Sequence, residues 1–166
     1  MEESKCRFIV RKATVNDIEK VIYINRVSLP ENYTKYFFIE HLNKWPNAFY
    51  VAEVDGEVVG YVMSRVELGW GITKLGLIKK GHIVSLAVLE KYRRRGIGTA
   101  LMLAALEGLK SYEAKEVYLE VRVSNTPAIK LYEKLGFVKK RVIPSYYLDG
   151  EDAYLMVKSL QQCKEP

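Results

Sequence analysis

The chain has 166 residues, of which 49% are hydrophobic and 28% are charged, and its 26 Lys and Arg residues against 20 Asp and Glu residues give a net charge of +6. This composition excludes a mainly disordered chain, and we expect a single domain over residues 1–166 with a core from about residue 7 to residue 160. No apolar run reaches the roughly 20 residues of a membrane-spanning helix, and the first residues do not resemble a signal peptide, so we expect a cytoplasmic protein without membrane contact.

The first half of the chain predicts a strand, two helices and a β-hairpin. Thr14 and Asp17 have the spacing of a capping box, which favours the start of a helix. Asp55 and Gly56 form a turn pair that is typical of hairpins. The expected elements are a strand at 7–11, a helix ending near Leu29 and Pro30 with Ile18, Val21, Ile22 and Asn25 on one face, a helix at 36–44, and hairpin strands at 48–54 and 57–66.

The second half alternates strands with helices. Residues 70–80 contain glycines and show little periodicity, so we expect a surface loop there. The further elements are expected at 82–88 (strand), 97–112 (helix), 116–123 (strand), 125–135 (helix), and 137–143 and 153–158 (strands). This order predicts an α/β (α+β) fold, with a mixed central sheet of about seven strands and helices on both faces.

A basic, glycine-containing loop follows the strand expected at 82–88. Arg93 precedes Gly96 and Gly98 in the pattern R-x-x-G-x-G, which opens the next helix. Backbone N–H groups at a helix N-terminus, flanked by arginines, can bind a phosphate group. The chain has neither a P-loop motif nor the third glycine of a dinucleotide-binding motif. On these residues alone, a basic helix cap without a ligand is an equal alternative.

Further segments, together with this motif, resemble a known family. The segments are residues 28–33 (SLPENY), 81–88 (GHIVSLAV), 121–125 (VRVSN) and 146–154 (YYLDGEDAY). Over nearly all of residues 6–160 the chain resembles the GNAT superfamily of acyl-CoA-dependent N-acetyltransferases. The likeness is greatest to the branch that includes the catalytic subunit of the NatA complex, its archaeal relatives and RimI-type enzymes, which acetylate protein α-amino groups. The resemblance implies a three-layer fold.

The resemblance also implies acetyl-CoA as the cosubstrate. In the family, the strand before the basic loop holds the pantetheine arm, and the loop wraps the pyrophosphate. Asn125 and Tyr132 would face the thioester, where the Tyr132 phenol would orient the sulfur or protonate the thiolate; the alternative for Tyr132 is a core aromatic. The implied cofactor-binding residues are Leu86, Ala87, Val88, Arg93, Arg94, Arg95, Gly96, Ile97, Gly98, Thr99, Asn125, Tyr132 and Lys134.

A base is needed because an α-amino group with a pKa of about 7.7–8.0 is mostly protonated at neutral pH. The resemblance places Glu31 beside the substrate N-terminus. His82 and Glu120 fall on expected neighbouring strands, where they could share a water as a base relay or capture an adventitious zinc ion, although two ligands are fewer than ordinary zinc sites have. One related branch has Tyr and His at these two positions, so the division of work between Glu31 and the pair stays open.

Substrate binding is expected from aromatic and loop residues. The candidates are Leu29, Pro30, Tyr33, Arg122, Tyr146 and Tyr147. Arg122 is expected to support Glu31 or Glu120, and exposed aromatics at a strand end are the alternative for Tyr146 and Tyr147. Cys6 and Cys163 lie outside every motif, so we expect direct attack of the amine in a ternary complex without an acyl-enzyme.

The expected substrates are protein N-termini that begin with Ser, Ala or Thr, and those that begin with Met-Leu. Acetylation of lysine side chains, of one ribosomal protein or of a small amine is the alternative within enzymes. A ribosome or nucleic-acid binding module using residues 91–95 is the alternative of another class. Nucleic acid is not required by the first reading, ribosome association is left open, and a monomer or weak oligomer is expected.

Overall fold

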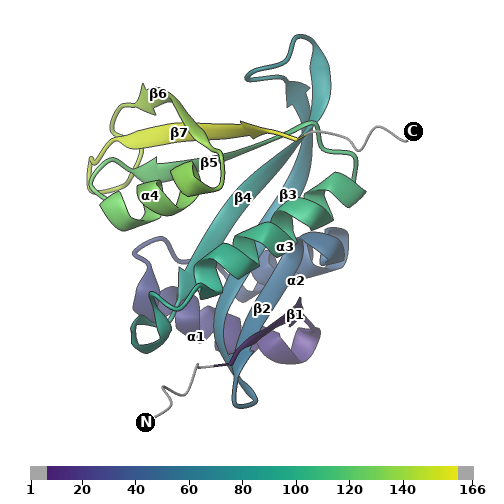
Figure 1. The fold of residues 1–166 in the computed structure, drawn as a ribbon, viewed down its shortest axis with the longest axis vertical. Coiled ribbons are helices and arrows are strands. Elements are labelled where there is room, and N and C mark those ends of the chain that lie inside the picture. The colour runs from purple at the N-terminus through teal and green to yellow at the C-terminus, as the bar shows by residue number, and fades with distance from the viewer. Residues whose placement is uncertain (1–6, 161–166) are drawn as a thin grey trace. The chain divides into compact units, whose positions relative to one another are not determined.

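The computed structural model describes residues 7–160, which form a seven-stranded mixed sheet with helices (Figure 1). The strands lie in the order β1-β2-β3-β4-β5-β7-β6. β4 and β5 are parallel, and the pairs β1–β2, β2–β3, β5–β7 and β6–β7 are antiparallel. The elements are β1 Ile9–Lys12, α1 Ile18–Ser28, α2 Lys35–Lys44, β2 Phe49–Val54, β3 Glu57–Trp70, β4 Leu77–Val88, α3 Ile97–Ser111, β5 Glu116–Arg122, α4 Thr126–Lys134, β6 Val138–Ile143 and β7 Ala153–Ser159.

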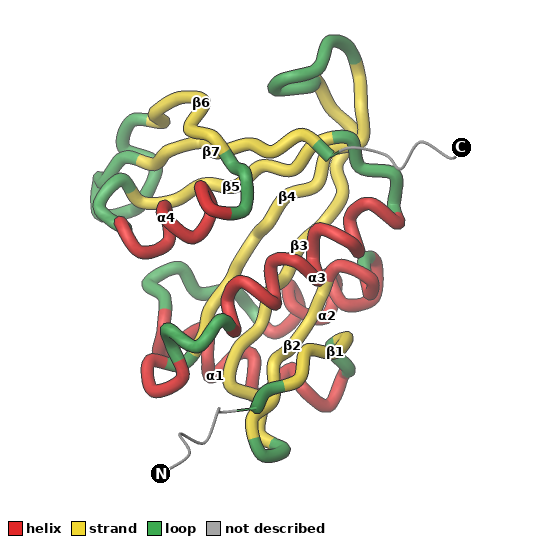
Figure 2. Tube along the Cα trace, in the orientation of Figure 1, coloured by secondary structure: helices red, strands yellow, loops and turns green. Residues whose placement is uncertain are grey.

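The predicted order of elements and the predicted fold class are confirmed (Figure 2). The chain forms two compact units, and the long strands β3 and β4 contribute to both. Within the described residues, the first unit contains 7–65 and 84–108, and the second contains 66–83 and 109–160. The single domain over residues 1–166 stays a prediction. No helix in the described range is long and apolar enough to cross a membrane.

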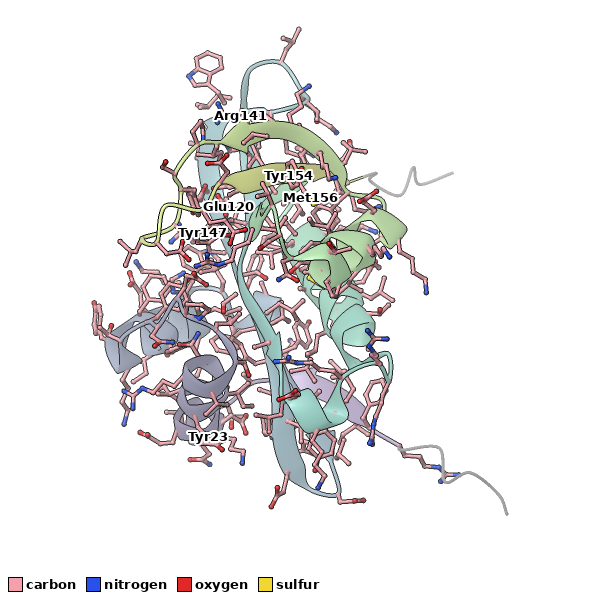
Figure 3. The ribbon with its side chains drawn as sticks, turned by 90° about the vertical axis from the view of Figure 1, so that its left-hand side faces the viewer. Tyr23, Glu120, Arg141, Tyr147, Tyr154 and Met156 are labelled. Atoms are coloured by element: carbon pink, nitrogen blue, oxygen red, sulfur yellow. The ribbon has the colours of Figure 1, made fainter. Side chains whose placement is uncertain are left out.

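The first unit is a layered core around β1, β2 and the adjoining parts of β3 and β4. In Figure 3, whose ribbon has the colours of Figure 1, α1 and α2 lie on one face of these strands and α3 lies on the other. The capping box of Thr14 and Asp17 forms on a short 3-10 turn directly before α1. The face of α1 predicted from the sequence is confirmed, because Ile18, Val21, Ile22 and Asn25 are all buried.

The second unit is built on β5, β6 and β7 with helix α4. The backbone register places Leu119 beside Met156 and Glu120 beside Leu155, so the two pairs face opposite sides of the sheet. In Figure 3, Met156 points to the side of α4 and Glu120 to the other side. Glu120 therefore lies on the face that α4 does not cover.

The surface loop expected at residues 70–80 is shorter in the structure, and both of its ends belong to strands. β3 extends to Trp70 and β4 begins at Leu77, so only residues 71–76 connect the strands. Leu68, Trp70, Leu75 and Leu77 are exposed on this hairpin. Apolar residues on the solvent side remove the alternation by which a strand is found in a sequence, which explains the difference.

Candidate functional site

The basic loop of the first unit has the backbone of an anion-binding turn. Arg94 has a φ of +62° and Gly96 a φ of +83°, and α3 begins directly after them at Ile97. The first N–H groups of any helix lack partners within the helix, so those of α3 can receive a phosphate. The guanidinium of Arg95 lies 5.6 Å from the centre of the Tyr92 ring. The loop thus combines positive charge with backbone donors.

Arg93 has a structural contact in this loop. Its Nε atom donates a hydrogen bond of 2.8 Å to the carbonyl oxygen of Val88, the last residue of β4. Arg93 therefore fastens the basic loop to the strand predicted to hold the pantetheine arm. On that strand Ala87 is buried, and Leu86 is half-buried. The pairing of β4 with β5 runs from Lys80 to His82 on β4, six residues before the strand ends.

The loop between α1 and α2 places Glu31 in the first unit. Glu31 is half-buried, and its backbone carbonyl accepts a hydrogen bond of 3.0 Å from Nδ2 of Asn25. Tyr33 stacks on Phe37 with ring centres 4.7 Å apart, and its hydroxyl lies 3.5 Å from the carbonyl oxygen of Val84 on β4. Leu29 is half-buried and Pro30 is exposed in the same loop.

His82 and Glu120 meet directly in the second unit. The Nε2 atom of His82 lies 2.7 Å from Oε2 of Glu120, and only 11% and 15% of the two side chains are exposed. The two side chains are in direct hydrogen-bond contact, and the shared water of the expected base relay stays a prediction. This contact places an imidazole and a carboxylate, the usual parts of a general base, on the face opposite α4.

Glu67 and Tyr118 also belong to this cluster, and the sequence reasoning missed both. The Tyr118 ring is stacked on His82, with centres 4.4 Å apart and planes 5° apart. Its hydroxyl donates a hydrogen bond of 2.5 Å to Glu67, whose Oε1 atom lies 3.6 Å from Nδ1 of His82. The signal for Tyr118 was its place on the same strand face as Glu120. Glu67 lies one residue beyond the strand expected at 57–66.

Arg122 pairs with two carboxylates of the turn after β6, and its expected support of Glu31 or Glu120 stays a prediction. Its Nη1 atom lies 2.8 Å from Asp149 and 3.1 Å from Glu151, and its guanidinium lies 4.1 Å above the Tyr147 ring. The Tyr147 ring meets the Tyr146 ring edge-on at 5.0 Å. The role of Arg122 in these contacts is to hold the turn after β6 that carries both tyrosines.

Hydrogen bonds keep the carboxylates of Asp149 and Glu151 in this turn ionised. The N–H of Glu151 and then Arg122 lower the pKa of Asp149. Contacts with Ser124 and then Arg122 lower the pKa of Glu151. Both carboxylates are therefore charged at neutral pH, which keeps their ion pairs with Arg122.

Helix α4 carries the remaining predicted cofactor residues. Tyr132 is buried, and burial raises its pKa to about 12, so the phenol keeps its proton at neutral pH. The side chain of Asn125 caps the helix by accepting a hydrogen bond of 3.3 Å from the N–H of Ala128. Lys134 is exposed in the last turn. Tyr132 can therefore act as a proton donor, while the Asn125 amide oxygen has a structural partner.

The predicted residues fall in both units, and each set is held by its own unit. The first contains Glu31, Leu29, Pro30, Tyr33, Leu86, Ala87, Val88 and the loop from Arg93 to Thr99. The second contains His82, Glu120, Arg122, Asn125, Tyr132, Lys134, Tyr146 and Tyr147. Residues 7–160 contain no group of three or more His, Cys, Asp or Glu side chains that could hold a metal ion. Cys6 and Cys163 lie outside the described residues.

Comparison with known proteins gives consistent matches. The model of the acetyltransferase (GNAT) family matches residues 17–137. An N-alpha-acetyltransferase of Sulfurisphaera tokodaii is 59% identical over 156 residues, which cover 91% of this chain and 92% of that protein. The N-terminal acetyltransferase A complex catalytic subunit NAA10 of Arabidopsis thaliana is 43% identical over 155 residues, which cover 92% of this chain and 78% of that protein.

Solved structures show the same fold. Ard1 from Thermoplasma volcanium superposes with a TM-score of 0.80 and 35% identity, over 93% of this chain and 99% of that one. Arabidopsis thaliana Naa50, solved with the bisubstrate analogue CoA-Ac-MVNAL, gives a TM-score of 0.79 and 25% identity, over 92% of this chain and 99% of that one.

Proposed function

The chain belongs to the acetyltransferase (GNAT) family, and from this premise we propose that it acetylates the α-amino groups of proteins, with acetyl-CoA as cosubstrate. The proposed substrates begin with Ser, Ala or Thr, or with Met-Leu. The observation that carries the proposal is the direct contact of His82 with Glu120, a base beside which an amine can lose its proton. The similarity to proteins named N-alpha-acetyltransferase supports the choice of the α-amino group.

The proposed reaction is a direct transfer in a ternary complex. The amine nitrogen attacks the thioester carbonyl, the carbon–sulfur bond breaks, and the amine proton passes to Glu31 or to the pair of His82 and Glu120. Tyr132 gives the departing thiolate a proton or a hydrogen bond, for which its protonated phenol is suited. Residues 93–99 would bind the pyrophosphate, and the strand residues Leu86 to Val88 the pantetheine arm.

We propose that several aromatic and loop residues bind the substrate. Tyr33 and the pair of Tyr146 and Tyr147 present aromatic walls with hydroxyl groups, which can pack a first side chain and bind a peptide backbone. Arg122 would act by holding the tyrosine turn. We propose that Leu29 and Pro30 limit the size of the first residue.

The test is release of free thiol from acetyl-CoA. Peptides that begin with Ser, Ala, Met-Leu and Met-Lys are compared, each also with a blocked N-terminus. Activity that disappears on blocking supports the proposal. Activity that survives blocking contradicts it and favours lysine side chains, and activity only with small amines or with one ribosomal protein favours those substrates.

Partners and location are part of the same proposal. The chain is expected to work in the cytoplasm as a monomer or weak oligomer, on proteins with or without the ribosome. The Arabidopsis relative is named as the catalytic subunit of a complex, so an auxiliary subunit is the alternative if the isolated chain binds acetyl-CoA without turnover. A nucleic-acid binding module would instead show steep salt dependence for nucleic acid and no affinity for acetyl-CoA.

A further inference from the structure

A buried polar network inside the first unit joins helix α1 to strands β3 and β4. Asn25 on α1 and Tyr61 on β3 are completely buried, and Ser85 on β4 is nearly so. Nδ2 of Asn25 donates a hydrogen bond of 3.1 Å to the Tyr61 hydroxyl, which lies 2.7 Å from Oγ of Ser85. Since Tyr61 accepts from Asn25, its own proton can go to Ser85, and the three side chains form a directed chain.

The same amide group of Asn25 also holds the loop that carries Glu31. Nδ2 donates to the backbone carbonyl of Glu31 at 3.0 Å. Oδ1 lies 3.4 Å from the N–H of Tyr33 and 3.3 Å from Nδ2 of Asn32. The loop is therefore held at the residue that carries the proposed base and again at the two residues that follow it.

The polar partners of Asn25, and not apolar packing, account for this residue on the inward face of α1. The neighbouring inward positions of α1 are Val21, Ile22 and Ile24, which bury apolar side chains in the same core. A buried amide is costly unless its polar atoms are paired, and here the partners come from the loop and from Tyr61. Burial raises the pKa of Tyr61 to about 12, so its hydroxyl stays protonated over the working pH range. The Tyr61 hydroxyl can therefore keep its hydrogen bonds to Asn25 and Ser85 over this pH range.

We propose that Asn25 is a positioning residue, which couples the loop of Glu31 to strand β4 through Tyr61 and Ser85. Ser85 directly precedes Leu86 to Val88, the segment proposed to bind the pantetheine arm. The coupling keeps Glu31 and the peptide N-terminus at a fixed distance from this segment, all within the first unit. The inference rests on the proposed function of that loop, but the coupling itself can be measured without turnover.

The first experiment measures backbone hydrogen exchange over residues 29–34. Tyr61→Phe removes one hydroxyl without changing the size of the ring, and Asn25→Ala removes the whole amide. Ser64→Ala is the matched control, because Ser64 lies on the same strand and its buried hydroxyl has no hydrogen-bond partner among the described residues. We expect about tenfold faster loop exchange in Asn25→Ala and a smaller increase in Tyr61→Phe, but no change in the control. Unchanged loop exchange in both network variants overturns the proposal.

A double variant tests the coupling. If Tyr61 acts on the loop only through Asn25, Tyr61→Phe adds nothing to the exchange rate of Asn25→Ala. Fully additive effects contradict the link. Val21→Ala, another buried site on α1, shows how much exchange follows from loss of stability alone.

Steady-state kinetics then test the consequence for the reaction. We expect the KM for the peptide to rise about tenfold in Asn25→Ala, with the Kd for acetyl-CoA alone within about twofold of wild type. Equal losses for both substrates, or a loss no larger than in Val21→Ala, contradict positioning. If the wild-type chain acetylates no peptide, alone or with an auxiliary subunit, the proposed function fails, whereas the coupling is still decided by the exchange measurements.

Discussion

The two candidate carboxylate bases, Glu120 and Glu31, have different neighbours, so mutations can separate their roles. Glu120 touches the imidazole of His82, whereas Glu31 is fixed through its backbone carbonyl. Replacing one base costs on the order of 100-fold in rate when that base acts alone. We expect Glu120→Gln to lower kcat/KM for Met-Leu peptides by that factor and Glu31→Gln to do so for Ser peptides.

The control for this pair of variants is Glu113→Gln. Glu113 belongs to the same unit as Glu120 but lies at the surface, in an ion pair with Lys79. Its loss should leave kcat/KM unchanged for both peptides. Equal losses for both peptides in the Glu120 and Glu31 variants would show that the two carboxylates serve one common step.

A mutation of Tyr132 can distinguish a chemical role of this residue from a packing role. Its ring packs edge-on against Phe137, and burial keeps the phenol protonated, with a pKa of about 12. Tyr132→Phe keeps the ring and removes only the proton donor, so we expect kcat to fall between about 10- and 100-fold with little change in the Kd for acetyl-CoA. The wild-type rate should show no titration of this group up to pH 10. An unchanged kcat in the variant would make Tyr132 a core aromatic.

At the scale of elements, the turn before α3 requires a residue that can adopt a positive φ. Gly96 has a φ of +83°, and a Cβ built there meets no atom within 4 Å, so Gly96→Ala adds strain without a clash. A non-glycine residue in this region costs roughly 1–2 kcal/mol, which is about 5- to 30-fold in affinity if the turn opens. We expect the Kd for acetyl-CoA, measured by calorimetry, to rise by about tenfold.

Gly56 provides the matched control for Gly96. Its φ is +79°, and a Cβ there also has open space, but it lies in the turn between β2 and β3. Gly56→Ala should lower the melting temperature without changing the Kd for acetyl-CoA. A similar loss of affinity in both variants would mean that the basic loop responds only to general destabilisation.

The hairpin of β3 and β4 is anchored by one carboxylate. Glu116 is fully buried and accepts hydrogen bonds from the backbone of Ile72 and from the N–H and hydroxyl of Thr73. Burial by itself would raise the pKa of Glu116, but the hydrogen bonds from Thr73 and Ile72 outweigh it and lower the pKa below its ordinary value. The carboxylate thus holds the turn at 71–76 in its ionised form.

This pKa shift sets a pH dependence. A group whose pKa is lowered by folding stabilises the fold above its unfolded pKa, about 4.3 for Glu, and this contribution is lost as the pH falls through the folded pKa. We expect the exchange protection of residues 71–76 to fall below about pH 4 in the wild type. Glu116→Gln should show low protection already at pH 7. Protection that does not change with pH would contradict the anchoring role.

At the scale of the whole molecule, local patterns were predictable and distant pairings were not. The capping box at Thr14 and the turn at Asp55 depend on residues at most three positions apart, and both were found from the sequence. The contact of Tyr118 with Glu67 joins residues 51 positions apart, and the ion pair of Arg122 with Asp149 joins residues 27 positions apart. Such pairings depend on strand register and turn geometry, which short sequence patterns do not contain.

The family resemblance predicted more of the candidate site than the residue patterns did. R-x-x-G-x-G alone left a helix cap as an equal reading, and the two tyrosines looked like chance exposed aromatics. The resemblance selected the residues, but it did not contain Asn25 or Tyr61 as links, because their value lies in hydrogen bonds between three elements. A buried Asn among apolar neighbours on α1 was the available signal.

Part of the positive charge of the chain lies on β6, the last strand in the sheet order. β6 is an edge strand, and five of its six residues are exposed, including Lys139, Lys140 and Arg141 between Val138 and Val142. The open backbone of an edge strand can pair with the same strand of another copy and so start aggregation. Adjacent cations repel such a copy, because each would bring the same three charges to the seam. The cations of β6 therefore disfavour pairing of this edge with the same edge of a second copy.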